Sequence, residues 1–293
     1  MNKIRKIRAV ISDHRQRKYI SYKEAIGNWY RTRNVQYKMY NISSVKEFKT
    51  SDTIFVLGNG PSLNLLNNEQ INVINNHNSF GVSFSFLKSD IIPTFHLFSL
   101  EPDPHGLKLL KEKFSHYRKA YKDVVMFLNS KAFFKMAHPR TTPSFFPEEA
   151  KCCFVWHPEA IALGSQRQFD DSDFDKSFLY RGILSRVLDL ISKLDYKNIV
   201  LLGVDLDRWN YFYEDIEDMA EGLKKTYEFA RGVEHVKEKD KKYPSMYPKD
   251  GKSQPLDEYL CALKDYLKRK KDVDLFIGFK NNMLYPKIPA YFD

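Results

Sequence analysis

Two turns in this 293-residue sequence combine residue types that could bind a nucleotide. The first is GNGPSL at residues 58–63, directly after the β-rich run Thr53–Leu57. Glycines let a backbone pass close to a ligand, and Pro61 can open a helix whose free N–H groups suit an anion. The turn has neither the lysine of a P-loop nor the third glycine of the dinucleotide fingerprint, where Leu63 stands. We interpret it as a nucleotide-binding turn, with a plain tight turn as the alternative.

The second turn is GVDLD at residues 203–207, which ends a buried apolar run. Asp205 could hold a ribose hydroxyl, cap a loop or bind a metal. Its spacing from Asp207 resembles the Asp-x-Asp motif with which many nucleotide-sugar transferases hold a divalent ion against a diphosphate. The spacing of these two carboxylates is therefore compatible with either a metal-free or a metal-binding site.

Aromatic side chains follow the second turn, at Trp209, Tyr211 and Tyr213. A phenol hydroxyl can donate a hydrogen bond to a phosphate without adding charge, although a partly buried aromatic cluster would have the same pattern. A lysine-rich stretch with few aliphatic residues comes next, at residues 231–254. We expect this stretch to form a lid over the site, and it contains His235.

Alternating strand and helix patterns must position these turns. The expected strands are Thr53–Leu57, Phe80–Phe84, Phe95–Leu100, Val124–Leu128, Asn198–Val204 and Val273–Phe276. Helical patterns cover residues 106–120, 180–194 and 256–267, the last with basic residues at its end, and residues 139–175 are expected to be irregular. Alternation of this kind predicts an α/β, Rossmann-like, doubly wound and mostly parallel sheet over residues 51–293. In such sheets, ligands bind beyond the carboxyl ends of the strands.

The charge is concentrated at the N-terminus. Residues 1–49 hold 13 Lys/Arg and 3 Asp/Glu, which is +10, whereas residues 50–293 hold 34 of each. Isoleucines and aromatics at helical spacing predict a basic amphipathic helical arm over residues 1–50, suited to an anionic membrane surface. The alternatives are helices that pack on the domain and, without a recognised module to support it, nucleic-acid binding.

The remaining composition excludes several classes of protein. With 43% apolar and 15% aromatic residues the chain can bury a core, so wholesale disorder is excluded. The sequence has no long apolar run, and its charged first residues do not read as a secretory signal. Three cysteines, at 152, 153 and 261, form neither a disulfide framework nor a zinc pattern, which favours a reducing compartment.

Several of these segments resemble bacterial sialyltransferases of glycosyltransferase family 42. GNGPSL is similar to the family's nucleotide-binding turn, and YKNIVLLGVD at residues 196–205 is similar to its Tyr-Lys-Glu-Ile-x-Leu-x-Gly-Ile-Asp segment. Arg181 with Gly182 resembles a nucleotide-contacting loop, and residues 275–286 resemble the final strand and turn. The match is patchy over about 53–293 and leaves residues 1–50 uncovered. The glycine turn and the Gly-x-Asp strand also occur in 6-hydroxymethylpterin pyrophosphokinase-like proteins and in Kdo transferases.

The resemblance implies an inverting, metal-free transfer of a sialic-acid-like or Kdo-like sugar from a CMP donor. It implies that Tyr213 binds the leaving phosphate, and that Asp207 stands where the family has a second phosphate-binding tyrosine. His235 is the candidate general base, and Asp250 is the alternative to it. The predicted nucleotide-binding residues are Gly58, Asn59, Gly60, Pro61, Ser62, Ser83, Arg181, Gly203, Asp205 and Asp207.

The expected acceptor is a bacterial surface glycan or glycolipid, such as lipopolysaccharide or capsule. With the basic arm, this places the protein in the cytoplasm, peripheral at the inner membrane. Two other functions remain open. One is a Mg²⁺-dependent pyrophosphokinase-like enzyme with Asp205 and Asp207 as ligands, and the other is a non-catalytic domain that binds a glycan or a partner.

Overall fold

The computed structural model describes residues 38–98, 104–129, 147, 150–155, 182–207, 210–214, 216, 219 and 255–292. Several predictions fall outside these ranges. They concern the helical pattern in the arm before Lys38, the contact residue Arg181, and the lid at 231–254 with its two candidate bases, His235 and Asp250.

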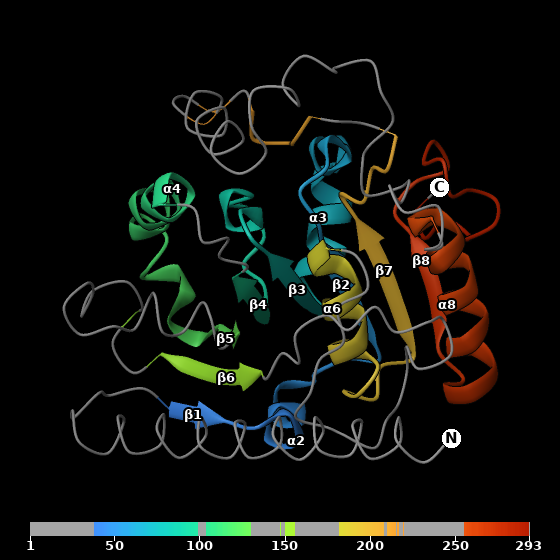
Figure 1. The fold of residues 1–293 in the computed structure, drawn as a ribbon, viewed down its shortest axis with the longest axis horizontal. Coiled ribbons are helices and arrows are strands. Elements are labelled where there is room, and N and C mark those ends of the chain that lie inside the picture. Colours follow the sequence, from blue (N-terminus) through green and yellow to red (C-terminus); the bar gives the residue numbers. More distant parts are fainter. Residues whose placement is uncertain are drawn as a thin grey trace, which may run out of the picture.

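The described strands form one eight-stranded parallel sheet with the order β1-β6-β5-β4-β3-β2-β7-β8 (Figure 1). From β2 the chain builds outward through β6 on one side, and β7 and β8 are then added on the other. The winding direction therefore reverses between β2 and β7, which confirms the doubly wound prediction. The strands are β1 Lys38–Tyr40, β2 Thr53–Leu57, β3 Asn78–Val82, β4 Phe95–Phe98, β5 Val125–Asn129, β6 Lys151–Val155, β7 Asn198–Leu202 and β8 Asp274–Ile277.

Helices connect the strands and cover the sheet (Figure 1). The α-helices of the described ranges are α2 Ile42–Val45, α3 Asn68–Asn75, α4 Pro104–Ser115, α6 Gly182–Ile191 and α8 Leu256–Lys271. Short 3-10 helices are η1 Lys46–Phe48, η2 Pro61–Leu65, η3 Ser85–Leu87 and η4 Ala120–Asp123. No helix in the part of the chain that the structure describes is long and apolar enough to span a bilayer.

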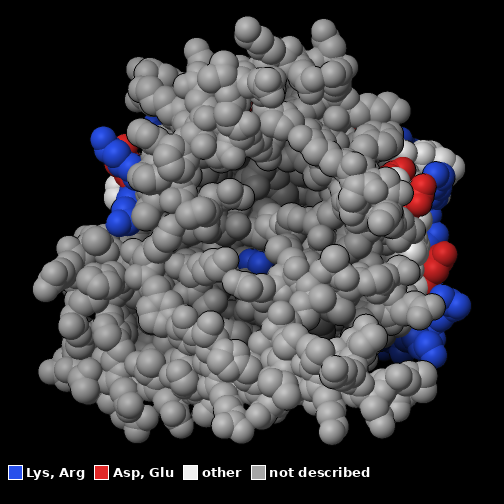
Figure 2. Space-filling view, viewed as in Figure 1, with Lys and Arg blue, Asp and Glu red and all other residues white. Residues whose placement is uncertain are grey.

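Charged side chains of the described residues show mainly at two flanks of the molecule, where Figure 1 places α4 and α8 (Figure 2). The last turn of α8 carries four consecutive basic residues, 268–271, as the sequence predicts. Cations at this end complement the helix dipole. Lys268 also pairs with Asp272 at 3.2 Å and Asp274 at 3.0 Å, beyond the end of the helix.

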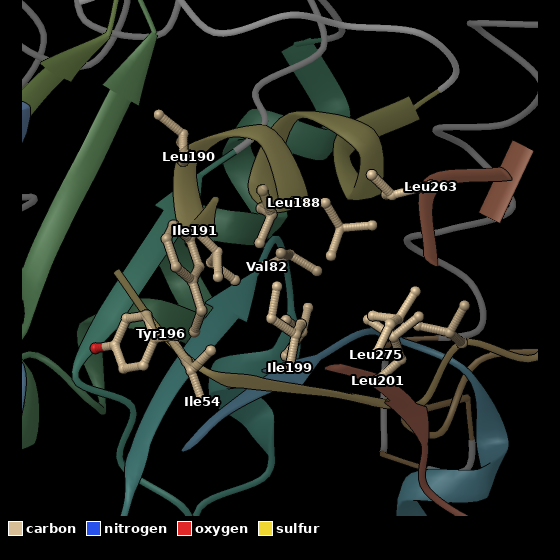
Figure 3. Close-up of a cluster of buried hydrophobic side chains, with 14 of the residues drawn as sticks. Ile54, Val82, Leu188, Leu190, Ile191, Tyr196, Ile199, Leu201, Leu263 and Leu275 are labelled. Carbon is tan, nitrogen blue, oxygen red and sulfur yellow. The ribbon is translucent and has the colours of Figure 1, made fainter. Parts of the chain in front are cut away.

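Alternate residues of each strand enter two separate cores, because side chains of a strand point to opposite faces of the sheet. On β2, Ile54 and Val56 pack in one core with α6 and α8, whereas Phe55 and Leu57 pack in the other with α3 and α4. Figure 3 shows the first core, in which strand residues lie opposite leucines of both helices. The sheet is therefore the middle layer of three.

Two short strands differ from the sequence-based expectation. β1 pairs with β6 in the sheet, at Lys38 with Lys151, so the sheet begins ahead of the boundary expected at residue 50. β6 lies in the stretch predicted to be irregular, and that prediction is wrong for Lys151–Val155. Its buried Cys152 and Cys153 alternate between the two cores, and a five-residue run with two cysteines carries little strand signal. All three cysteines of the chain are free.

Candidate functional site

The two chemistry-bearing turns meet at the carboxyl ends of β2 and β7, which are neighbours in the sheet. The amide of Gly58 donates to the carbonyl of Leu202 at 2.7 Å, and that of Gly60 donates to Gly203 at 2.8 Å. The pairing of the two strands thus continues into the turns. Because the winding direction reverses here, the turns flank the crevice in which doubly wound sheets bind ligands.

The close contact between the two turns explains why glycine is required at these positions. A Cβ on Gly58 would overlap the carbonyl oxygen of Gly203, and one on Gly60 would overlap the Asp205 carboxylate. Gly203 has φ +63°, and its Cβ would lie 2.7 Å from Leu63 Cγ. The sequence predicts that the first two glycines allow the close approach of a ligand. In the structure, the close approach is between the two turns themselves.

Asp205 caps the first turn. Its Oδ2 accepts a hydrogen bond from the amide of Ser62 at 2.7 Å. Pro61 opens η2 at its first position, as predicted, although the helix is 3-10, and Gly60 has no side chain that could cap it. Asp205 could hold a ribose hydroxyl, cap a loop or bind a metal, and the structure shows the loop cap. The Ser62 amide is consequently occupied by a carboxylate of the protein.

Asp207 lies on the surface, two residues beyond the cap. No group of three or more histidine, cysteine or acidic side chains could hold a metal within the described ranges. The described part of the site therefore offers a Mg²⁺ ion at most the Asp205–Asp207 pair, and Asp205 is already bonded to Ser62.

Asn59 offers an acceptor without a partner. Its backbone carbonyl accepts from the amide of Phe212 at 3.0 Å, and the Asn64 side chain donates to the carbonyl of Phe212 at 2.9 Å. These bonds fasten the segment after β7 to the glycine turn. The side-chain Oδ1 of Asn59 is buried and has no hydrogen-bond partner. A buried unpaired acceptor is costly, so this atom suits a ligand hydroxyl or amino group.

Ser83 lies at the end of β3, beside the glycine turn. Leu57 of β2 pairs with Gly81 of β3, so Asn59 and Ser83 each stand two residues beyond that pair. Ser83 has φ 51°, in the left-handed region, and its amide donates to the carbonyl of Leu97 at 3.0 Å. The turn after β3, which contains Ser83, therefore lies at the same edge of the sheet as the glycine turn and the Asp205 turn.

Tyr213 packs in an aromatic cluster. Its ring stacks on Tyr211 with centroids 5.2 Å apart and lies 5.5 Å from the ring of Phe84, which follows Ser83. Tyr213 is 2% exposed, so the structure shows the aromatic cluster that the sequence offered as an alternative. Its contact with a leaving phosphate stays a prediction.

Asn282 is a residue of this region that the sequence patterns do not single out. Its side-chain amide donates to the carbonyl of Val204 at 2.9 Å and so anchors the second turn. The only signal was its place in the final segment that resembles the sialyltransferases. Three predicted site residues lie outside the described part of the chain: Arg181, His235 and Asp250. Their roles stay predictions.

No protein-family model matches this sequence, and no curated protein is detectably similar to it. Several solved structures are similar in fold, at low identity. The monofunctional α-2,3-sialyltransferase Cst-I from Campylobacter jejuni is 15% identical with a TM-score of 0.41, over 83% of this chain and 81% of that one. Sialyltransferase CstII from the same organism, in complex with CMP-3FNeuAc, is 15% identical with a TM-score of 0.42, over 81% and 85%. Its complex with cytidine-5'-monophosphate is 13% identical with a TM-score of 0.42, over 81% and 84%.

Proposed function

We propose that this protein is an inverting glycosyltransferase that uses a CMP-activated, sialic-acid-like or Kdo-like donor sugar. The observation that carries the proposal is the meeting of the glycine turn with the Asp205 turn at the point where the winding of the sheet reverses. Both segments also resemble those of family 42 sialyltransferases. The proposed acceptor is a bacterial surface glycan, such as lipopolysaccharide or capsule.

We expect the described residues to contact different parts of the nucleotide. Asn59 Oδ1 has no partner and would accept from a ribose hydroxyl or the cytosine amino group. Ser83 stands two residues beyond a paired position on the adjacent strand, where its hydroxyl can both donate and accept. Because the Ser62 amide is bonded to Asp205, we do not assign it to the donor phosphate.

In the proposed reaction, an acceptor hydroxyl attacks the anomeric carbon of the donor sugar as the bond to the CMP phosphate breaks. His235 would take the proton of the hydroxyl, because a neutral imidazole is a competent base at neutral pH. CMP leaves with the electron pair of the broken bond. Tyr213 would donate to its phosphate oxygen, where negative charge develops. A single phosphate needs less charge compensation than a diphosphate, so this chemistry does not require a divalent ion.

A thermal-shift panel tests the nucleotide. The purified protein is heated with CMP, CDP, UDP or ATP, each with and without EDTA. We expect CMP to raise the melting temperature equally in both conditions, because a ligand that binds only the folded state stabilises it. Stabilisation by ATP that requires Mg²⁺ would contradict the proposal and favour a pyrophosphokinase. No stabilisation by any nucleotide would favour a non-catalytic binding domain.

The base is tested separately from nucleotide binding. We expect His235→Ala to abolish transfer while CMP still raises the melting temperature, because the base acts only in the chemical step. Asp250→Ala is the matched variant. Normal turnover in His235→Ala together with loss in Asp250→Ala would move the role to Asp250.

The basic arm is proposed to hold the enzyme at the cytoplasmic face of the inner membrane. The test is a truncation that stops before Lys38, because β1 and the buried Ile42 and Val45 belong to the folded domain. Removing residues 1–36 is expected to abolish salt-sensitive binding to vesicles with anionic lipids while leaving activity on a soluble acceptor. Unchanged vesicle binding would refute the membrane role of the arm.

A further inference from the structure

A buried histidine on β4 supports the Ser83 turn. His96 is fully buried, and its Nε2 lies 3.0 Å from the carbonyl oxygen of Ser83. A carbonyl oxygen only accepts, so Nε2 carries the hydrogen and donates it. This assignment leaves Nδ1 as an acceptor, and the hydroxyl of Tyr121 lies 3.4 Å from it.

The surrounding residues leave room for this ring and fix its position. Gly81 pairs with His96 across β3 and β4, and a Cβ at Gly81 would lie 2.6 Å from His96 Nδ1. The imidazole centroid lies 4.2 Å from that of Phe98 and 5.5 Å from that of Tyr121. The missing side chain of Gly81 therefore provides the space that the imidazole needs.

Burial also keeps His96 uncharged, since it lowers the pKa of the imidazole to about 3. A neutral ring has one donor and one acceptor, which matches the Ser83 carbonyl on one side and the Tyr121 hydroxyl on the other. Tyr121 is itself buried, which raises the pKa of its phenol well above the ordinary value, so it remains a donor.

We propose that His96, oriented by Tyr121, is a positioning residue that holds Ser83 in its left-handed conformation at the edge of the donor pocket. This inference rests on the proposed function. Serine rarely adopts a left-handed backbone without support. Here the carbonyl of Ser83 is bonded to His96, and its amide is bonded to the carbonyl of Leu97, so both backbone groups are tied to β4.

The hydrogen bond between His96 and Ser83 also affects the aromatic cluster around Tyr213. Phe84 follows Ser83, and its ring lies 5.5 Å from that of Tyr213. A change in the Ser83 backbone would move Phe84 away from this contact. His96 thus acts on the Ser83 side chain and, through Phe84, on Tyr213, without touching the donor itself.

Three variants separate the hydrogen bond from simple packing. His96→Gln keeps an N–H donor near Nε2, His96→Phe fills the space without one, and Tyr121→Phe removes the hydroxyl that faces Nδ1. Leu267→Ala on α8 is the control, because α8 packs against β8, which β2 and β7 separate from β3. Affinity for CMP is measured by calorimetry at a temperature where every variant remains folded.

We expect His96→Phe to weaken CMP binding by about tenfold or more, which corresponds to about 1.4 kcal/mol. His96→Gln should restore most of this affinity, Tyr121→Phe should fall in between, and Leu267→Ala should bind as the wild type does. Wild-type affinity in His96→Phe, or equal losses in His96→Gln and His96→Phe, would overturn the inference.

A crystal structure of His96→Phe keeps this test independent of the proposed function. If the wild-type protein binds no nucleotide, the proposed function fails, but the conformation of Ser83 can still be observed. A φ of Ser83 that leaves the left-handed region in His96→Phe and remains there in His96→Gln supports the positioning role. A left-handed Ser83 in both variants refutes it.

Discussion

The carboxylate of Asp205 accepts a hydrogen bond from the backbone amide of Ser62 at 2.7 Å, across 143 residues of sequence. The bond joins the turn after β7 to the start of the helix after β2. It therefore uses the one acidic side chain of the GVD segment for structure rather than leaving it free for a ligand. The two turns form one structural unit, so a substitution in either turn should also disturb the conformation of the other.

Asp205→Ala is expected to lower the free energy of unfolding by about 0.5–2 kcal/mol, the usual effect of removing an N-terminal cap. CMP affinity should fall with it, because the first turn loses one of its hydrogen bonds to the second. Urea denaturation and calorimetry measure the two effects. Asp207→Ala is the control, since this exposed residue should change stability by less than about 0.5 kcal/mol. Equal losses of stability in the two variants would contradict the capping role.

Gly203→Ala should destabilise the fold by more than about 1 kcal/mol, because an L-residue is strained at positive φ. The new methyl would also press on Leu63, whose Cγ lies 2.7 Å from the position it would occupy. A double-mutant cycle with Leu63→Ala separates the two causes. Crowding predicts that the double variant loses less stability than the sum of the single ones, whereas strict additivity would leave backbone strain as the cause.

His96 should make the protein less stable in acid. Its pKa is about 3 in the fold and about 6.5 when exposed, so below pH 6.5 the unfolded chain binds a proton that the folded chain does not. Stability therefore falls as the pH falls, by about 1.4 kcal/mol per unit, or about 2 kcal/mol between pH 6.5 and 5. The titratable side chain in direct contact, Tyr121, is uncharged throughout this range.

Urea unfolding of the wild type and His96→Gln at pH 7.5 and pH 5 measures this contribution. The variant should lose about 2 kcal/mol less between the two pH values. Identical pH dependence in the two proteins would mean that His96 is charged in the fold or that it is not buried in solution.

Arg186 on α6 carries a buried charge at a cost to stability. The residue is 6% exposed, its Nε has no hydrogen-bond partner, and burial lowers the pKa of the guanidinium to about 10. Arg186→Met keeps the long side chain and removes the charge, so we expect stability to rise by about 1 kcal/mol or more. Lys270→Met on the exposed end of α8 should change it by less than about 0.5 kcal/mol. A large loss in Arg186→Met would show that the guanidinium has an anionic partner in solution.

Local patterns were sufficient for much of the fold. The first strand of the alternating pattern is β2, with the bounds that its β-rich run predicted, and Pro61 begins the following helix at the expected position. α8 ends in its basic turn because the dipole and the apolar spacing act over a few residues. β1 and β6 were missed because runs of three and five residues carry too little periodicity to detect.

The sequence by itself determined the class of fold and the two turns that carry the site, since both follow from residue type and short-range spacing. The tertiary structure decided what those residues do. It placed β2 next to β7, so the glycines accommodate a neighbouring backbone and Asp205 caps Ser62. It also brought the imidazole of His96 within hydrogen-bonding distance of the Ser83 carbonyl. These relationships join residues far apart in the chain, and only the packing of strands against one another sets the distances between them.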